Sequence, residues 1–177
     1  MNEKKKNKVM KLVLSGLLAA FVTVATMLIH IPTPTKGYIN LGDCFVNISA
    51  WMLGPIFGAG AAGIGSAIAD LLLGYTVYVP ATFIIKALMA MVSFHIFRLL
   101  SKRMHGFFSR TIAAVAAEIV MIAGYFIFEC ILYGSFATAL TGVPGNIVQG
   151  VGGVVISVVL YEALLGRIPF IKAQSKT

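Results

Sequence analysis

Residues 4–31 read KKKNKVMKLVLSGLLAAFVTVATMLIHI, a basic cluster followed at once by an apolar run. Residues 12–31 contain no Asp, Glu, Lys or Arg, and about 20 apolar residues are what a helix needs to cross the hydrocarbon core of a bilayer. A basic segment before an apolar run is also typical of a signal peptide, but the apolar part of a signal peptide is shorter. We therefore expect residues 12–31 to form a retained first transmembrane helix.

The composition of the whole chain agrees with a membrane protein. Of 177 residues, 59% are hydrophobic and only 11% are charged, and the mean hydropathy is +0.93. A soluble domain of this size would carry many more charges on its surface. The net charge of +8 does not indicate nucleic-acid binding, because the basic residues lie in short clusters between apolar runs. The length suits one transmembrane domain covering residues 1–177.

Further apolar segments divide the rest of the chain. Four of them have spanning length, and a shorter one, residues 41–53, ends at Gly54-Pro55. Proline is well suited to the first position of the helix that follows. The sequence therefore predicts an all-α membrane protein in which residues 12–166 form a bundle of six transmembrane helices; the four spanning segments are residues 56–74, 81–100, 111–133 and 143–166.

The basic residues predict the orientation of this bundle. With six helices both termini lie on one side, and with that side cytoplasmic all but two of the 14 Lys and Arg residues are inside. The exceptions are Lys36 in an outer loop and Lys86 within a helix. Residues 1–11 are then a basic cytoplasmic N-terminus and residues 167–177 a cytoplasmic tail. The inner residues are Lys4, Lys5, Lys6, Lys8, Lys11, Arg98, Lys102, Arg103, Arg110, Arg167, Lys172 and Lys176.

Small residues recur at helical spacing in two places. Gly54 and Gly58 have GxxxG spacing, which predicts close packing of the second and third helices. No Lys-Ser/Thr pair follows to make a phosphate-binding loop. In the first helix, Ser15, Gly16, Ala19 and Ala20 form two small-residue pairs, which serve either packing within the bundle or docking onto a partner's helix. Spacing alone favours packing.

Ionisable residues inside membrane helices are costly, and each is a candidate for function. Counted from the helix ends, the polar residues of five helices lie about 6 to 9 Å or less below the outer surface. They predict a pocket open to the outside with aromatic walls and a few polar groups. The candidate substrate-binding residues are Tyr38, Asn40, Asp43, Asn47, Trp51, Tyr78, Lys86, Tyr125, Glu129, Asn146 and Gln149.

A structural role for the same residues remains open. Lys86 would pair with Asp70 or Glu129, of which we expect Asp70, while the tyrosines would form an interfacial belt. The inner half of the bundle is poorer in polar groups, with Glu118, Glu162 and His95.

The sequence predicts no catalytic site, no metal and no cofactor. His30, His95 and His105 are scattered without an H-E-x-x-H motif, and Ser66 lacks a G-x-S-x-G frame. Cys44 and Cys130 lack metal-ligand spacing, so we expect two small buried apolar residues and leave a disulfide between them open. An intramembrane protease using Ser66 and His95 is disfavoured because the two residues differ in depth.

Several motifs resemble the substrate-binding S components of energy-coupling factor (ECF) vitamin transporters. The stretch GYINLGD at residues 37–43 is similar to the first-loop motif of that family. The resemblance continues through LGP at 53–55, GIGSAIADL at 63–71 and YVPATFIIKAL at 78–88. It covers the first four helices, and the last two only in general character.

The resemblance implies an S-component fold in a bacterial cell membrane and no ATPase activity of its own. It implies three protein partners, a transmembrane coupling subunit and two cytoplasmic ATPases, and a vitamin carried inward by toppling of the helices. Ser15/Ala19 or Gly16/Ala20 would fill the place of the family's docking motif, a pair of alanines four residues apart. The motifs look closest to members for pyridoxine or hydroxymethylpyrimidine, with riboflavin or another vitamin as the alternative.

A self-contained, ion-coupled secondary transporter is the second interpretation. It requires a polar path across the membrane, and only Glu118 indicates such a path in the inner half.

Overall fold

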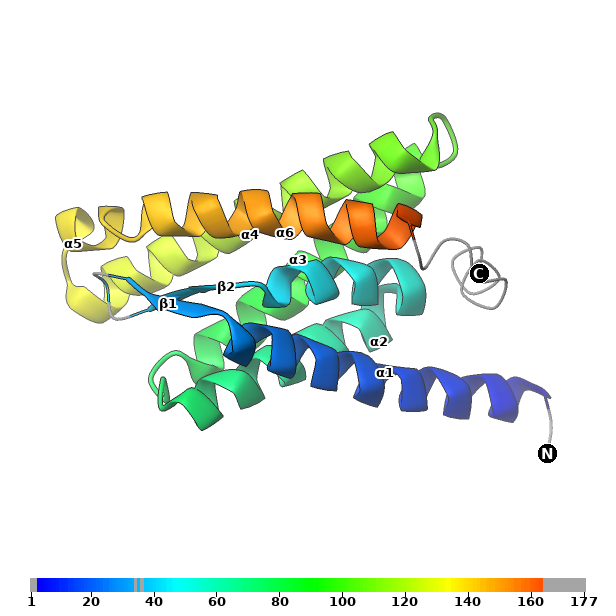
Figure 1. The fold of residues 1–177 in the computed structure, drawn as a ribbon, viewed down its shortest axis with the longest axis horizontal. Coiled ribbons are helices and arrows are strands. Elements are labelled where there is room, and N and C mark those ends of the chain that lie inside the picture. The colour runs from blue at the N-terminus through cyan, green and yellow to red at the C-terminus, as the bar shows by residue number, and fades with distance from the viewer. Residues whose placement is uncertain (1–2, 34, 36, 164–177) are drawn as a thin grey trace.

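The computed structural model describes residues 3–33, 35 and 37–163, and it is mostly helical (Figure 1). Lys36 and the tail at 167–177, with Arg167, Lys172 and Lys176, lie outside the described residues. The elements in chain order are α1 (Glu3–Leu28), β1 (His30–Pro32), β2 (Tyr38–Asn40), α2 (Gly42–Leu73), α3 (Val79–Leu100), α4 (Gly106–Tyr133), α5 (Phe136–Leu140) and α6 (Val143–Ala163).

The helices run back and forth between two ends of the molecule. The start of α1, the turn from α3 to α4 and the end of α6 lie at one end (Figure 1). The two strands, α5 and the turn from α2 to α3 lie at the other end, which is called the hairpin end below. Five helical segments of the described chain are long and apolar enough to cross a membrane. Large apolar side chains such as Leu12, Leu72 and Ile131 are exposed on the outside, as lipid contact requires.

The count of spanning elements differs from the six predicted, because the segment at 41–53 is part of α2. The predicted break is confirmed: Gly54 has φ 81° and ψ −177°, outside the helical region. Behind it the chain folds back, since a Cβ on Gly58 would come within 2.7 Å of the Ser49 carbonyl oxygen and 2.9 Å of Ala50 Cα. The element α2 therefore consists of two arms, 42–53 and 55–73, that pack closely, as the glycine spacing predicted.

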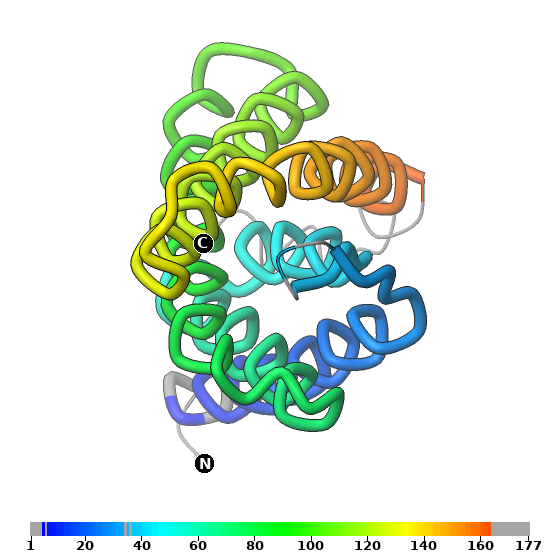
Figure 2. The backbone as a smooth tube through the Cα atoms, turned by 90° about the vertical axis from the view of Figure 1, so that its left-hand side faces the viewer, coloured from blue at the N-terminus to red at the C-terminus, as the bar shows by residue number. Residues whose placement is uncertain are grey.

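The two strands are a feature that the sequence did not predict. They pair antiparallel with His30 opposite Asn40, Ile31 opposite Ile39 and Pro32 opposite Tyr38. Seen along the bundle, this hairpin lies inside the ring of helices between α6 and α1 (Figure 2). It carries the chain inward, so that α2 begins inside the bundle and Asp43 is fully buried.

Small residues let the helices approach closely. Thr23 Oγ1 of α1 donates to the Gly65 carbonyl oxygen of α2 at 2.8 Å, and a Cβ on Gly65 would meet the Ala19 carbonyl oxygen at 2.5 Å. Ala19 is therefore used in packing of the bundle. Gly16 has no heavy atom within 4 Å of where its Cβ would stand, and Ala20 is exposed. The structure thus separates the two small-residue pairs of α1, one facing inward and one outward.

Candidate binding site

A small, partly open cavity lies at the hairpin end. The room inside it is about 20 Å³, enough for one water molecule, and the empty space amounts to about 350 Å³ when the open mouth is included. Five parts of the chain contribute to it: the hairpin region, the ends of α2 and α4, and the beginnings of α3 and α6. Its lining includes six of the predicted binding residues, namely Tyr38, Asn40, Tyr78, Tyr125, Glu129 and Asn146. It also includes four residues not predicted to bind, namely Thr33, Gly37, Asp70 and Thr82.

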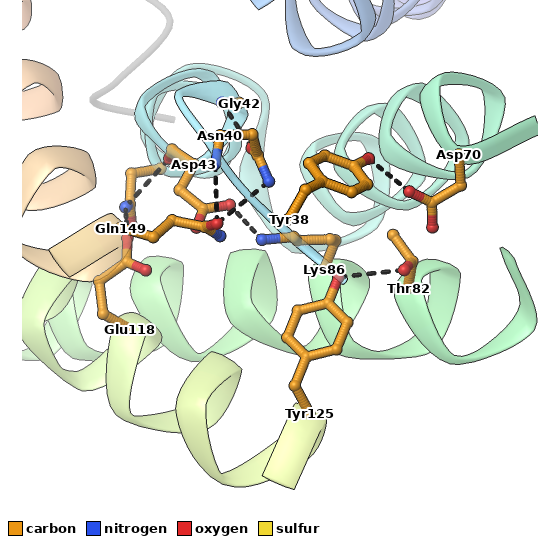
Figure 3. A network of polar contacts seen from close by, with 11 residues as sticks. Tyr38, Asn40, Gly42, Asp43, Asp70, Thr82, Lys86, Glu118, Tyr125 and Gln149 are labelled. Carbon is orange, nitrogen blue, oxygen red and sulfur yellow. Dashed lines mark hydrogen bonds and ion pairs between the residues drawn. The ribbon is translucent and has the colours of Figure 1, made fainter. Parts of the chain in front are cut away.

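One wall of the cavity is built on Asp70, near the end of α2. The Tyr38 hydroxyl donates to Asp70 Oδ1 (Figure 3). The Tyr38 ring lies 4.6 Å from that of Tyr75, centroid to centroid. Burial and the neighbouring Asp70 raise the pKa of Tyr38, so its phenol stays protonated and donates. Asp70 itself is 2% exposed, and its Oδ2 has no hydrogen-bond partner among the described residues.

Another part of the lining is Glu129, in the last turns of α4. The Tyr78 hydroxyl donates to the Thr35 carbonyl oxygen at 2.7 Å and lies 3.3 Å from Glu129 Oε1. Glu129 Oε2 is buried without a partner in the described part of the chain. It lies against Gly142, where a Cβ would approach it to 2.7 Å. A second buried carboxylate oxygen is thus unsatisfied at this site.

Behind the cavity lies a buried polar network that joins four helices. Lys86 of α3 pairs with Asp43 Oδ1, and Gln149 Nε2 of α6 donates to Asp43 Oδ2 at 2.6 Å. Gln149 Oε1 accepts from the Asn40 backbone N–H at 2.9 Å (Figure 3). Because Asn40 also lines the cavity, it connects the cavity to the network.

The network continues away from the cavity. Asn47 Nδ2 donates to Glu118 Oε1 at 3.1 Å, and the Ser93 hydroxyl donates to Asn47 Oδ1 at 2.8 Å. Trp51 Nε1 donates to Ser93 Oγ at 3.0 Å. The Trp51 ring packs edge-on against Tyr161, 5.7 Å between centroids, and the hydrogen-bonded chain ends in this aromatic contact.

The predicted ion pair between Lys86 and Asp70 is wrong, because Lys86 pairs with Asp43. The prediction placed Asp43 at the outer surface, whereas the hairpin carries it inward to face α3. Asp70 is engaged by Tyr38 instead.

Other predicted binding residues also lie away from the cavity lining. Asp43, Lys86, Gln149 and Asn47 belong to the network, and Trp51 lies at its far end. Glu118, assigned by sequence to the inner half, joins the same network from the middle of α4. Thr82 was missed because a threonine in a membrane helix carries no charge and gives no signal of its own; its hydroxyl lies 3.0 Å from that of Tyr125.

No catalytic or metal-binding cluster is found in the described part of the chain. His95 Nδ1 lies 2.7 Å from the Met91 carbonyl oxygen, and the Ser66 hydroxyl has no partner among the described residues, so they form no dyad. No group of three His, Cys, Asp or Glu residues within 3–33, 35 and 37–163 is placed to hold a metal ion. Cys44 and Cys130 are free thiols, the first buried and the second half-buried, so the structure has no bridge between them.

Comparison with known proteins gave matches of three kinds. A sequence model of the family described as "ECF-type riboflavin transporter, S component" matches residues 6–165. A protein of Pyrococcus woesei, described as an "uncharacterized protein in gap 3'region", is 36% identical over 136 residues, 76% of this chain and 88% of that protein. A solved structure described as "Structure and mechanism of the S component of a bacterial ECF transporter" is similar in fold, with a TM-score of 0.73 at 21% identity, over 90% of this chain and 97% of that one.

Proposed function

The chain belongs to the family of ECF-type riboflavin transporter S components, and on this premise we propose that it binds a small water-soluble vitamin or vitamin precursor for uptake across the cell membrane. The observation that carries the proposal is the cavity at the hairpin end. Polar side chains from five parts of the chain converge there, and two buried carboxylate oxygens have no partner among the described residues. Polar groups are expensive inside a membrane protein, and a ligand that pairs with them explains their presence.

We propose further that the cavity opens to the outside. If the two arms of α2 count as two crossings, the bundle has six crossings. The start of α1 and the end of α6 then lie on the same side, which we assign as cytoplasmic. Arg98, Lys102, Arg103 and Arg110 flank the turn from α3 to α4, opposite the hairpin end, as the positive-inside rule expects of a cytoplasmic turn. In intact cells an impermeant thiol reagent should label Thr76→Cys and not Ser101→Cys; the reverse pattern would contradict this orientation.

The lining of the cavity suits a small aromatic heterocycle, which would enter as the walls move apart, since the room inside is about 20 Å³. Tyr38, Tyr78 and Tyr125 offer ring faces for stacking. Asn146 both donates and accepts, so it is suited to a ring nitrogen or a hydroxyl group. The motifs at 37–43 and 78–88 favour pyridoxine or hydroxymethylpyrimidine as the substrate, and the name of the family keeps riboflavin as the alternative.

Uptake also requires partners. The sequence has no phosphate-binding loop, so the energy would come from two cytoplasmic ATPases through a transmembrane coupling subunit. We propose that α1 docks onto the coupling subunit with the face that carries Gly16 and Ala20, because this face is open. Ser15 and Ala19 lie beside it, and the Ser15 hydroxyl donates to the Lys11 carbonyl oxygen of its own helix.

The test of this function is ligand binding. The chain is purified with and without the coupling subunit and ATPases, and B vitamins are titrated onto it in lipid nanodiscs. We expect one of them to bind with submicromolar affinity, and Asn146→Ala to weaken binding without unfolding the protein. Asn7→Ala, at an exposed position of α1, is the matched control. Absence of any submicromolar ligand would contradict the proposal.

The buried network favours one second candidate, an ion-coupled transporter that acts alone. Polar side chains continue from Asn40 to Trp51 through the interior, farther than the sequence indicated. The network ends, however, where Trp51 packs against Tyr161 and Phe97. Gradient-driven uptake by liposomes that contain this chain alone would favour the second candidate over the first.

A further inference from the structure

The buried carboxylates that line the cavity indicate the charge of the ligand. Asp70 and Glu129 line the cavity, are 2% and 3% exposed, and each leaves one buried oxygen without a partner among the described residues. An isolated buried carboxylate is strongly unfavourable unless a cation or several donors meet it. Without such a partner a buried acid takes up a proton instead, so a cationic ligand is the complement that would keep both acids charged.

No described residue of the lining is Lys, Arg or His. Lys86, the buried lysine next to the cavity, is paired with Asp43. Its ammonium lies 5.5 Å from the centroid of the Tyr125 ring, so Tyr125 is a neighbour of both Lys86 and the cavity. The positive charge of Lys86 is thus already used in the network.

The remaining walls are also suited to positive charge. Tyr38, Tyr78 and Tyr125 bring three aromatic rings to a cavity that holds two acids. Aromatic faces attract cations, and a hydrogen bond from a charged donor to a carboxylate is stronger than one between neutral groups. Acids and tyrosines together indicate a site for a cationic group.

We propose that the ligand is a small organic cation, a heteroaromatic ring with a protonated or permanently charged nitrogen, and that Asp70 and Glu129 bind this nitrogen. The proposal rests on the proposed function, because it assumes that the cavity is the vitamin site, and it narrows the ligand from pyridoxine itself to a cationic relative such as pyridoxamine. It also predicts what is rejected: a phosphate or carboxylate on the same ring would place like charges together at low dielectric.

The test is a titration of the full-length chain in nanodiscs with rings that differ in charge. Pyridoxamine, pyridoxine and pyridoxamine 5'-phosphate share one ring, thiamine is permanently cationic, and riboflavin is neutral. We expect pyridoxamine or thiamine, the cationic compounds, to bind at least about tenfold more tightly than pyridoxine, riboflavin and pyridoxamine 5'-phosphate.

Two substitutions assign the effect to the acids. Asp70→Asn and Glu129→Gln keep the shape of each side chain, and Asp70→Asn still accepts from Tyr38. Each should weaken binding of the cation by about 10- to 100-fold and bring the ratio of cation to neutral affinity closer to one. Glu162→Gln removes a carboxylate that pairs with Arg110 at the opposite end of the molecule. It is the matched control and should change neither the affinity for the cation nor the ratio of cation to neutral affinity. The affinity ratio separates this effect from a loss of folding, and each variant is tested independently.

The outcomes separate this inference from the proposed function. Tightest binding of riboflavin or pyridoxine, unchanged by both substitutions, would overturn the cation and leave the vitamin-binding function standing. Binding of none of the compounds, nor of any other B vitamin, would overturn both.

Discussion

Lys86 has a structural role, because it forms an ion pair with Asp43 in the interior of the bundle. Both side chains are almost fully buried, and Gln149 fixes the second oxygen of Asp43. Removing one member of such a pair leaves the other charge buried without compensation, which costs about 3–5 kcal/mol.

We therefore expect Lys86→Met and Asp43→Asn each to lower the free energy of unfolding by about 3–5 kcal/mol, and the double variant to lose less than the sum. Thermal unfolding in detergent measures this, with Glu162→Gln as a control in the half-buried pair with Arg110. Additive losses would show that the two residues do not interact.

Gly142 is the residue that makes room for the Glu129 carboxylate. A Cβ there would stand 2.7 Å from Glu129 Oε2, so Gly142→Ala should displace the carboxylate and weaken ligand binding about tenfold or more. The stability of the protein should change little, because a side chain can turn away. Gly60→Ala, at a glycine with no heavy atom nearby, is the control. If Gly142→Ala binds the ligand with wild-type affinity, Glu129 does not take part in ligand binding.

At the scale of the element, the turn within α2 depends on Gly54. Its φ of 81° with ψ of −177° belongs to a region that only glycine adopts without strain. Gly54→Ala should lower the free energy of unfolding by about 1–3 kcal/mol, measured by thermal unfolding. Gly60→Ala, within the helical second arm, should have no such cost. Equal stability of Gly54→Ala and Gly60→Ala would mean that the turn between the two arms does not require a glycine at position 54.

The helix α1 carries the proposed docking face. Gly16→Leu should leave ligand binding intact and abolish assembly with the coupling subunit, because a large side chain would fill the open face. Co-purification with the coupling subunit and ATPases measures assembly. Gly60→Leu, at another open glycine on α2, should assemble normally. Normal assembly of Gly16→Leu would show that this face does not dock.

Elements with a strong signal could be predicted from the sequence, and the hairpin could not. Long apolar runs predicted α1, α3, α4 and α6, and Gly54-Pro55 predicted the break in α2. The strands, with the sequences HIP and YIN, are too short for a period to show. The missed hairpin led to further errors, because depth was counted from an assumed surface start of the segment at 41–53.

The candidate site was predictable to the extent that burial in a membrane is costly. That argument found Glu129, Asn146 and the three tyrosines of the lining, because polar and aromatic residues stand out in apolar helices. It could not say which acid Lys86 meets, since both arms of α2 and the helix α4 carry acids. Only the path of the hairpin decides in favour of Asp43 over Asp70.

For the whole molecule, the account requires a ligand-binding site at one end and the basic turn from α3 to α4 at the other. Exposed apolar side chains cover the outside, while the polar groups of five chain segments meet in the cavity and the network behind it. This polarity along the bundle is what a subunit needs to take a ligand from one side and meet its partners on the other.

The most direct measurement is a structure of the full-length chain with the vitamin that binds it. The account predicts the ligand between Tyr38, Asp70 and Glu129, with a ring against the tyrosines and Asn146 within hydrogen-bonding distance. A ligand bound elsewhere, for example in the apolar groove between α4 and α6 beside Val151 and Ile119, would contradict it.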